Sequence, residues 1–285
     1  MSAKDTHFSN KTTLNCNGQL LFLDEPLVMG ILNVTLDSFF DGGKHQTEQQ
    51  ILQHTENMLN EGADIIDIGA YSTRPNADEV SEEEERKRLI SAIKTVHKHF
   101  PGAIISADTF RSQIAKEAIE SGAAIINDIS GGQFDDKMFE TVAQLHVPYV
   151  LMHIKGKPQT MQQNPIYEDV VKEISMYFAE KINQLRLLGI NDIILDVGFG
   201  FGKTLEHNYE LMNKLNHFKI FGLPLLAGIS RKSMINKILG TIPETALNGT
   251  TVLNTFALLK EAKILRVHNV KQAVETVKLI SQFTN

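Results

Sequence analysis

The sequence predicts an α/β fold of the (β/α)8 TIM-barrel class with a short N-terminal β-hairpin. Eight short, β-branched or apolar segments alternate with longer amphipathic segments, the pattern of parallel strands connected by helices. These units fill residues 27–283, close to the usual barrel size of about 250 residues. We expect one domain over residues 1–285, with residues 1–25 as a hairpin extension. A doubly wound open sheet is the alternative.

The hairpin is predicted from residues 13–23, where two short strands flank Asn17-Gly18. This dipeptide favours the positive backbone angles of a tight turn, and we interpret the hairpin as a structural flap. The strands that follow are expected at residues 27–33, 65–68, 104–108, 124–128, 149–153, 193–197, 225–230 and 264–268.

Each predicted strand is followed by a predicted helix. The helices are expected at residues 46–61, 81–99, 111–121, 136–145, 169–188, 206–216, 231–239, 246–261 and 270–283. Ser81 and Glu84 form a capping-box pattern, and the acidic residues at 82–85 complement a helix dipole. That acidic run therefore requires no functional explanation.

Composition excludes several classes of protein. The chain is 42% hydrophobic and 22% charged, as in globular proteins, and its net charge of −6 argues against a general nucleic-acid surface. No apolar run approaches the roughly 20 residues that span a bilayer, so we expect no membrane partner. Cys16 is the only cysteine and no signal-peptide pattern is evident, which favours a cytoplasmic protein.

Polar residues end the predicted strands, and a barrel brings all strand ends to one face. They are Asn33, Asp108, Asn127, Asp128, His153, Asp196, Ser230 and His268. The carboxyl-terminal face is where barrel enzymes build their sites. Any one of these residues can instead cap the following helix. A ring of them indicates a site.

Two long loops and several fixed cations belong to the same face. The loops are residues 35–43, which carry Phe39 and Asp41, and residues 70–76, which carry Arg74. The aromatic loop residues either cover a flat ligand or pack on the barrel rim. The cations are Arg74, Lys203, Arg231, Lys232 and Arg266. Arginine suits phosphate because its planar fork donates two parallel hydrogen bonds, so we expect an anionic group among some of them.

The glycine-rich segment GFGFGKT at 198–204 is not a nucleotide motif. A phosphate loop requires glycine at position 197, which is valine here, and the spacing also differs from the dinucleotide fingerprint. The histidines and Cys16 lack transition-metal spacing. A Mg²⁺ ion held by few protein groups and by substrate phosphates leaves little trace in a sequence.

Seven segments together carry a resemblance to dihydropteroate synthase, a family of pterin-binding enzymes. They are MGILNVTLDSFFDGG (29–43), DIGAYSTRP (67–75), ISADT (105–109), INDISGG (126–132), GFGFGK (198–203), GISRKS (228–233) and RVH (266–268). They occur in family order. Each alone is weak evidence, but the set is highly specific.

The resemblance implies a barrel that condenses 6-hydroxymethyl-7,8-dihydropterin diphosphate with p-aminobenzoate, giving 7,8-dihydropteroate and diphosphate in folate biosynthesis. It also implies Mg²⁺ as cofactor, a homodimer, and a sulfonamide target. The implied pterin ligands are Asp108, Asn127, Asp196 and Lys232. The implied diphosphate ligands are Asn33, Arg74, Arg266 and His268, with Asn33 also touching the metal. The implied aminobenzoate pocket is Phe39, Thr73, Pro75, Phe201 and Ser233, with Asp41 in the first mobile loop.

The residue types suit this reaction. Two carboxylates, an amide and an ammonium complement the donors and acceptors of a reduced pterin edge. Cleavage of the carbon–oxygen bond leaves negative charge on diphosphate, which Arg74, Arg266, His268 and Mg²⁺ would stabilise. Asp108 or Asp196 would stabilise the cation on the pterin methylene. We therefore expect a dissociative substitution, with Asp108, Lys232, Arg266 and His268 as the catalytic residues.

Four positions depart from the usual family pattern. Leu36 and Val197 replace prolines, Asn76 replaces glycine, and Asn269 replaces aspartate, while the implied ligands are retained. We expect activity to be retained. Two other functions remain open: a methyltetrahydrofolate-type pterin-binding methyltransferase, and a catalytically inactive pterin-binding protein.

Overall fold

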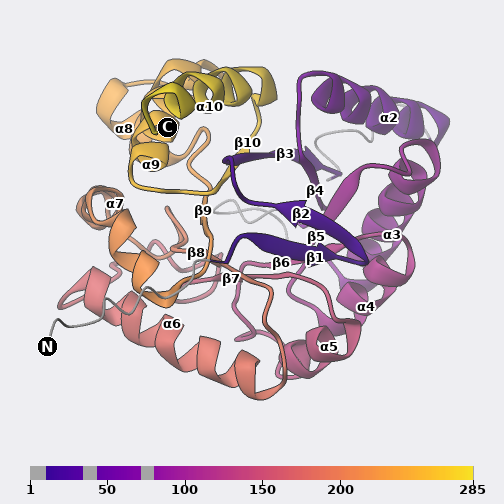
Figure 1. Ribbon diagram of the computed structural model, residues 1–285, viewed down its shortest axis with the longest axis horizontal. Helices are drawn as coiled ribbons and strands as arrows, with labels where there is room; N and C mark the ends of the chain where they lie inside the picture. Colours follow the sequence, from indigo (N-terminus) through magenta and orange to yellow (C-terminus); the bar gives the residue numbers. More distant parts are fainter. Residues whose placement is uncertain (1–10, 35–43, 72–79, 285) are drawn as a thin grey trace, which may run out of the picture.

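The strands form a closed parallel barrel with helices around its outside (Figure 1). The computed structural model describes residues 11–34, 44–71 and 80–284. The strand order is β10-β3-β4-β5-β6-β7-β8-β9, and β9 pairs with β10 to close the ring. The expected (β/α)8 barrel is therefore confirmed, and the open-sheet alternative is wrong. The predictions for Phe39, Asp41, Thr73, Arg74 and Pro75 lie outside the described residues, as do Leu36 and Asn76.

The observed elements follow the predicted order closely. The barrel strands are β3 (Leu27–Asn33), β4 (Ile65–Gly69), β5 (Ile104–Asp108), β6 (Ile125–Asp128), β7 (Tyr149–Met152), β8 (Ile193–Asp196), β9 (Leu225–Ala227) and β10 (Ile264–Val267). The helices are α2 (Lys44–Asn60), α3 (Glu82–His99), α4 (Ser112–Glu120), α5 (Met138–Leu145), α6 (Val170–Leu187), α7 (Leu205–Asn213), α8 (Ser233–Leu239), α9 (Leu247–Leu259) and α10 (Val270–Thr284).

Three local features differ from the elements predicted from the sequence. Helix α7 ends at Asn213, and a 3-10 helix, η2 (Leu215–Phe221), follows it. Leu215 and Phe218 are both buried, and their spacing of three residues matches the 3-10 period. A second short 3-10 helix, η3 (Pro243–Thr245), precedes α9. Strand β9 ends at Ala227, earlier than expected, because the chain turns where Lys232 N–H bonds to Ile229 O at 3.1 Å.

The N-terminal hairpin closes one end of the barrel. Strands β1 (Thr13–Cys16) and β2 (Gln19–Phe22) are antiparallel, and Asn17 and Gly18 have φ values of 53° and 90°, as the turn prediction required. The hairpin lies across the centre of the barrel in Figure 1. Leu14, Cys16 and Leu23 are buried against the inward residues at the start of the strands. The hairpin, which we expected to be a structural flap, therefore closes this end of the barrel as a plug.

Inward-facing residues change character along the strands. At the plugged end they are apolar, and this layer contains Leu27, Met29, Ile65, Ile104, Ile125, Val150, Ile194, Leu226 and Ile264. Because alternate residues share a face, residues two or four positions farther along also point inward. Those positions include Asn33, Asp67, Asp108, Asn127, Asp196 and Arg266. The apolar layer supports a polar layer at the other end.

Outward-facing strand residues pack beneath the helices in the largest apolar cluster, which includes Ile66, Ile105, Leu151 and Leu195. Helix α3 begins where Ser81 Oγ accepts a hydrogen bond from Glu84 N at 3.3 Å, which is one of the two bonds of the predicted capping box. The Glu84 carboxylate pairs with Arg88 one turn later, at 2.7 Å. Among the helices of the described ranges, none is long and apolar enough to cross a bilayer.

Candidate active site

A buried ion-pair network lies at the centre of the polar layer. Arg266 Nε donates to Asp67 Oδ2 at 2.7 Å, and Arg266 Nη2 lies 2.6 Å from the same oxygen. The same Nη2 donates to Asp108 Oδ2 at 2.7 Å. Asn127 Nδ2 lies 3.3 and 3.2 Å from the two Asp67 oxygens. One arginine therefore holds two carboxylates, and one of these carboxylates also orients an amide.

Asp67 was not among the site residues expected from the sequence. Its side chain is fully buried, whereas those of Asp108 and Arg266 are 18% and 21% exposed. Asp67 is the only polar residue of an otherwise apolar β4, two positions after the inward-facing Ile65. A charged residue in a buried strand requires a partner. That rule marks Asp67 as noteworthy but does not identify Arg266, 199 residues away.

The pKa of Asp108 in this network is raised to about 7. Burial is the main cause, Arg266 opposes it, and the Asp67 charge adds to it. Burial alone would lower the pKa of Arg266, but Asp67 and Asp108 raise it above its ordinary value. Arg266 is therefore a fixed charge. Asp108 changes its protonation near neutral pH.

Asp196 and Lys232 form the neighbouring part of the site. Asp196 Oδ1 accepts a hydrogen bond from Gly198 N at 2.7 Å. Lys232 Nζ donates to the carbonyl of Phe199 and lies 4.6 Å from the centre of the Phe201 ring. Burial lowers the pKa of Lys232 to about 8, although Asp196 opposes the shift. Burial raises the pKa of Asp196, and the Lys232 charge opposes that shift.

The remaining described candidates lie around these groups. His268 Nδ1 lies 3.0 Å from Ser230 Oγ, and His268 N donates to the same oxygen at 3.2 Å. Asn33 ends β3 on the inward side and is half-buried. Ser233 is the exposed first residue of α8. The barrel thus places the described candidate residues at one mouth.

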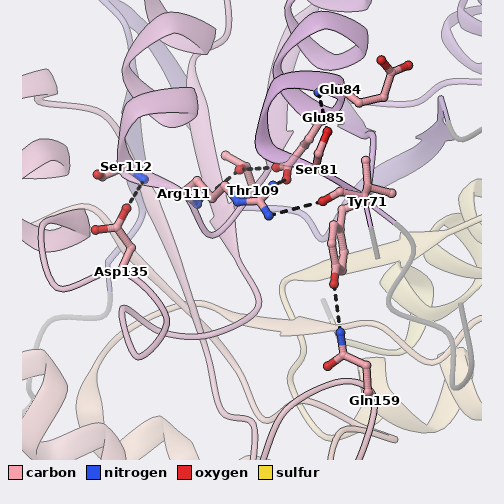
Figure 2. Close-up of polar contacts among 10 residues, drawn as sticks. Tyr71, Ser81, Glu84, Glu85, Thr109, Arg111, Ser112, Asp135 and Gln159 are labelled. Carbon is pink, nitrogen blue, oxygen red and sulfur yellow. Dashed lines mark hydrogen bonds and ion pairs between the residues drawn. The ribbon is translucent and has the colours of Figure 1, made fainter. Parts of the chain in front are cut away.

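A second polar network supports the loop after Asp108 (Figure 2). Thr109 Oγ1 donates to Glu85 Oε1 at 2.7 Å, and Arg111 pairs with the same buried carboxylate. Arg111 Nη2 also donates to Val80 O at 3.4 Å. Burial raises the pKa of Glu85, while Thr109 and Arg111 oppose the shift. Helix α3 is thereby tied to the chain that leaves β5.

The connection between β7 and α6 reaches two other parts of the mouth. Gln159 Nε2 donates to the hydroxyl of Tyr71, just after β4, at 3.2 Å (Figure 2). Gln162 Nε2 donates to the carbonyl of Gly200, after β8. Met161 of the same connection packs in a small apolar cluster with Phe110, Phe134 and Phe201. No motif or spacing in the sequence pointed to this connection.

Two expected surface cations point elsewhere. Lys203 is only 2% exposed, and its Nζ lies among His153 and Phe201 atoms rather than in the open mouth. Arg231 donates to Asn269 Oδ1 from Nε at 3.3 Å and from Nη2 at 3.0 Å. The prediction was that an anionic group binds among some of the five cations of this face, and the amine of Lys203 is occupied by three acceptors of the protein.

Two departures from the family pattern are described. Val197 is fully buried in the large apolar cluster. Asn269 accepts from Arg231 with an amide oxygen, so the arginine keeps its partner but not an opposite charge. Both residues leave the Asp67–Arg266–Asp108 network unchanged.

This set of groups defines a barrel whose mouth carries carboxylate and amide acceptors beside fixed cations. Comparison with known proteins gives its class. The model of the pterin binding enzyme family matches residues 29–268. The chain belongs to this family.

Individual relatives narrow the resemblance to one kind of enzyme. Dihydropteroate synthase of Escherichia coli K12 is 44% identical over 269 residues, covering 94% of this chain and 95% of the relative. A crystal structure of Yersinia pestis dihydropteroate synthase with a sulfonamide drug is 41% identical, has a TM-score of 0.89, and covers 95% of this chain and 98% of that chain. Dihydropteroate synthase from Xanthomonas albilineans in complex with 7,8-dihydropteroate is 35% identical, with a TM-score of 0.86 and coverages of 95% and 98%. The resemblance inferred from the motifs is confirmed.

Proposed function

We propose that this protein is a dihydropteroate synthase. It condenses 6-hydroxymethyl-7,8-dihydropterin diphosphate with p-aminobenzoate and releases diphosphate. The observation that carries the proposal is the contact of Arg266 with both Asp67 and Asp108. In this proposal Arg266 is the fixed cation for the leaving group, and it lies directly beside Asp108, a carboxylate acceptor for the ring.

The pterin ring is assigned to Asp108, Asn127, Asp196 and Lys232. The two carboxylates accept from ring N–H groups, the amide offers both a donor and an acceptor, and the ammonium donates to a carbonyl or ring nitrogen. Asn127 is oriented by Asp67, and Asp196 by Gly198 N. A ring that leaves one of these buried groups unpaired would bind more weakly by about 1–3 kcal/mol for each group.

The diphosphate is assigned to Arg266 and His268, with Asn33 and Arg74. Arg266 has five N–H donors. Its Nε and Nη2 groups donate to the two carboxylates, and the N–H groups of Nη1 are assigned to the diphosphate. Asn33 offers a hard, neutral oxygen at the end of β3, which suits Mg²⁺ held mainly by diphosphate oxygens and water. No group of three His, Cys, Asp or Glu in the described ranges forms a metal cage. Mg²⁺ supplies neutralisation of the leaving group's charge.

We propose dissociative substitution at the methylene carbon. The carbon–oxygen bond breaks first, its electron pair leaves with diphosphate, and the pterin ring shares the resulting cation. Asp108 stabilises that cation when ionised, and the amine of p-aminobenzoate then attacks the methylene and loses a proton. A heavy-atom isotope effect showing a fully concerted transition state would exclude this order.

The test of the function is diphosphate release by the purified protein. We expect release that requires both substrates and Mg²⁺, with sulfonamides competing against p-aminobenzoate. A folded protein that releases no diphosphate would overturn the proposal. A methyltransferase would instead transfer a methyl group from a folate to a corrinoid, and an inactive protein would bind the pterin without turnover. Neither alternative explains why cations lie beside the carboxylates that are assigned to the pterin ring.

The pH dependence of pterin use is expected to follow Asp108. Its pKa of about 7 lies above the ordinary value, so lowering the pH through 7 protonates it and removes an acceptor from the site. We therefore expect kcat/KM for the pterin diphosphate to fall below pH 7, about tenfold for each further pH unit. Initial rates from pH 5.5 to 9 test this. An acid limb that stays flat down to pH 5.5 would contradict it.

We also propose a homodimer that uses an apolar face of α8 and α9. Val252, Phe256 and Leu259 form an exposed stripe at spacings of four and three along α9, and they are 57%, 40% and 54% exposed. Ile238 and Leu239 continue this face on α8, which packs against α9 at Gly249. A second copy of the chain would remove this apolar surface from water.

Phe256→Glu is expected to dissociate this dimer. A charge at the centre of an apolar interface loses hydration, and the Lys260 ammonium beside position 256 compensates that loss only in part, so the dimer should weaken at least a hundredfold, about 3 kcal/mol. Light scattering after gel filtration measures the mass at micromolar concentration. Leu187→Glu, on the distant α6, is the matched control because Leu187 is 79% exposed. Equal dimer content in both variants would refute this interface.

A further inference from the structure

The loop after β8 is held mainly by side chains, together with a backbone hydrogen bond from Phe201 N to Gly198 O at 3.0 Å. It runs from Val197 to Thr204, and Gly198, Gly200 and Gly202 have φ values of 68°, 83° and 61°. A Cβ at Gly198 or Gly202 would overlap the carbonyl oxygen of His153 or Lys155. The loop therefore lies directly against the chain that leaves β7.

Four successive carbonyl groups of this loop each accept a hydrogen bond from a different side chain. The donors are Lys232 to Phe199, Gln162 to Gly200, Lys203 to Phe201 and Tyr167 to Gly202. Residues with alternating left-handed backbone angles have no regular backbone partners, so these donors determine the path of the loop. The path in turn determines where the ring of Phe201 stands.

Lys203 is the most enclosed of the four donors, at 2% exposure. Its Nζ lies 2.9 Å from Phe201 O, 3.3 Å from His153 O and 3.0 Å from His153 Nδ1. Three acceptors match the three N–H groups of an ammonium, and burial lowers the pKa of that ammonium well below its ordinary value while Asp196 opposes the shift. His153 Nδ1 accepts only if the ring is neutral, and burial and the Lys203 charge lower its pKa well below the ordinary value.

We propose that Lys203 is a positioning residue for the aminobenzoate pocket. It joins the β8 loop to the end of β7 and fixes the carbonyl of Phe201. The ring of that residue thereby stays 4.6 Å from the Lys232 ammonium. Lys203 does not touch substrate. This inference rests on the proposed function, in which Phe201 forms one wall for p-aminobenzoate.

Lys203→Met tests the proposal because methionine keeps the apolar stem and removes all three donors. We expect the KM for p-aminobenzoate to rise tenfold or more, since small displacements of a positioning group can cost up to about a hundredfold. The KM for the pterin diphosphate should change less than about threefold, because Asp196 is held independently by Gly198 N. Lys263→Met is the matched control: it removes an ammonium that donates to Asp24 O at 3.2 Å at the plugged end of the barrel, and we expect both KM values to stay within about twofold.

Lys203→Gln provides a second variant if the methionine protein does not fold. Its amide keeps a donor on a shorter side chain, so the same selective rise in KM should appear at smaller size. Circular dichroism and thermal melting establish folding for every variant. Equal changes in both KM values, or none, in a folded Lys203 variant would overturn the proposal. Absence of diphosphate release by the unmodified protein would instead overturn the proposed function.

Discussion

Replacing Arg266 by methionine is expected to lower kcat by about 10²–10³-fold, the range seen when one preorganised stabilising group is removed from an active site. The variant loses the cation assigned to the departing diphosphate. It also leaves Asp67, which is fully buried, and Asp108 without their shared partner. Breaking a buried pair by removing one member typically costs about 3–5 kcal/mol of folding stability. Activity and stability should therefore both fall.

The loss of stability should depend on pH. Arg266 opposes the upward shift in the pKa of Asp108, so the variant should have a higher Asp108 pKa in the folded state. A carboxyl group whose folded-state pKa is raised stabilises the protein below its unfolded pKa, and loses that contribution as pH rises through the folded value. The difference in melting temperature between the two proteins should therefore be smaller near pH 4 than at pH 9.

Arg266→Lys is the conservative comparison for this experiment. Lysine keeps the positive charge but cannot reach two carboxylates with a planar fork. We expect it to recover most of the stability and only part of the turnover. Wild-type kcat in a folded Arg266→Met protein would show that the cation beside Asp108 does not serve the reaction.

Asp67→Asn is expected to have the second largest effect. Asp67 accepts from Arg266 Nε at 2.7 Å and from Asn127 Nδ2 at 3.2 Å. An asparagine of the same shape presents one amino group in place of an acceptor, so either Arg266 or Asn127 faces a donor. Misplacement of these groups should lower kcat/KM on the order of a hundredfold. The loss should appear in kcat/KM for the pterin diphosphate, because Arg266 and Asn127 are assigned to two groups of that one substrate.

The same variant should shift the acid limb in the direction opposite to Arg266→Met. The Asp67 charge raises the pKa of Asp108, so its removal should move the limb to lower pH. Asp64→Asn is the matched control on the same chain segment. Asp64 accepts from Val28 N at 2.8 Å, before β4 and away from the mouth, and the asparagine keeps an acceptor there. If the acid limb of Asp67→Asn does not shift, the charge of Asp67 does not affect the pKa of Asp108.

Much of the fold was predictable because its signals are local. The bounds of β3 and β5 agree with the expected ranges, and the turn at Asn17-Gly18 has the expected positive φ values. The early end of β9 and the 3-10 helix η2 were not predicted. Those features depend on which side chains are buried by neighbouring elements, such as Leu215 and Phe218.

The site was predictable in part for the same reason. Asp108, Asn127, Asp196 and Arg266 were identified from strand ends and motifs, and the barrel brings them to one mouth. Asp67 was missed, because a carboxylate inside an apolar strand has no local partner. Lys203 was expected among the cations of this face, but its burial against His153 was not predicted, because a lysine in a loop is ordinarily solvated.

The sequence by itself determined the alternation of strands and helices, the inward set of each strand and the family motifs. All three follow from residue types and spacings within short segments. Only the tertiary structure decided that Arg266 holds Asp67 and Asp108, that Lys203 faces His153, and that the hairpin plugs the barrel. Closing the ring between β9, β10 and β3 brings distant residues within hydrogen-bond distance, and burial then selects among their partners.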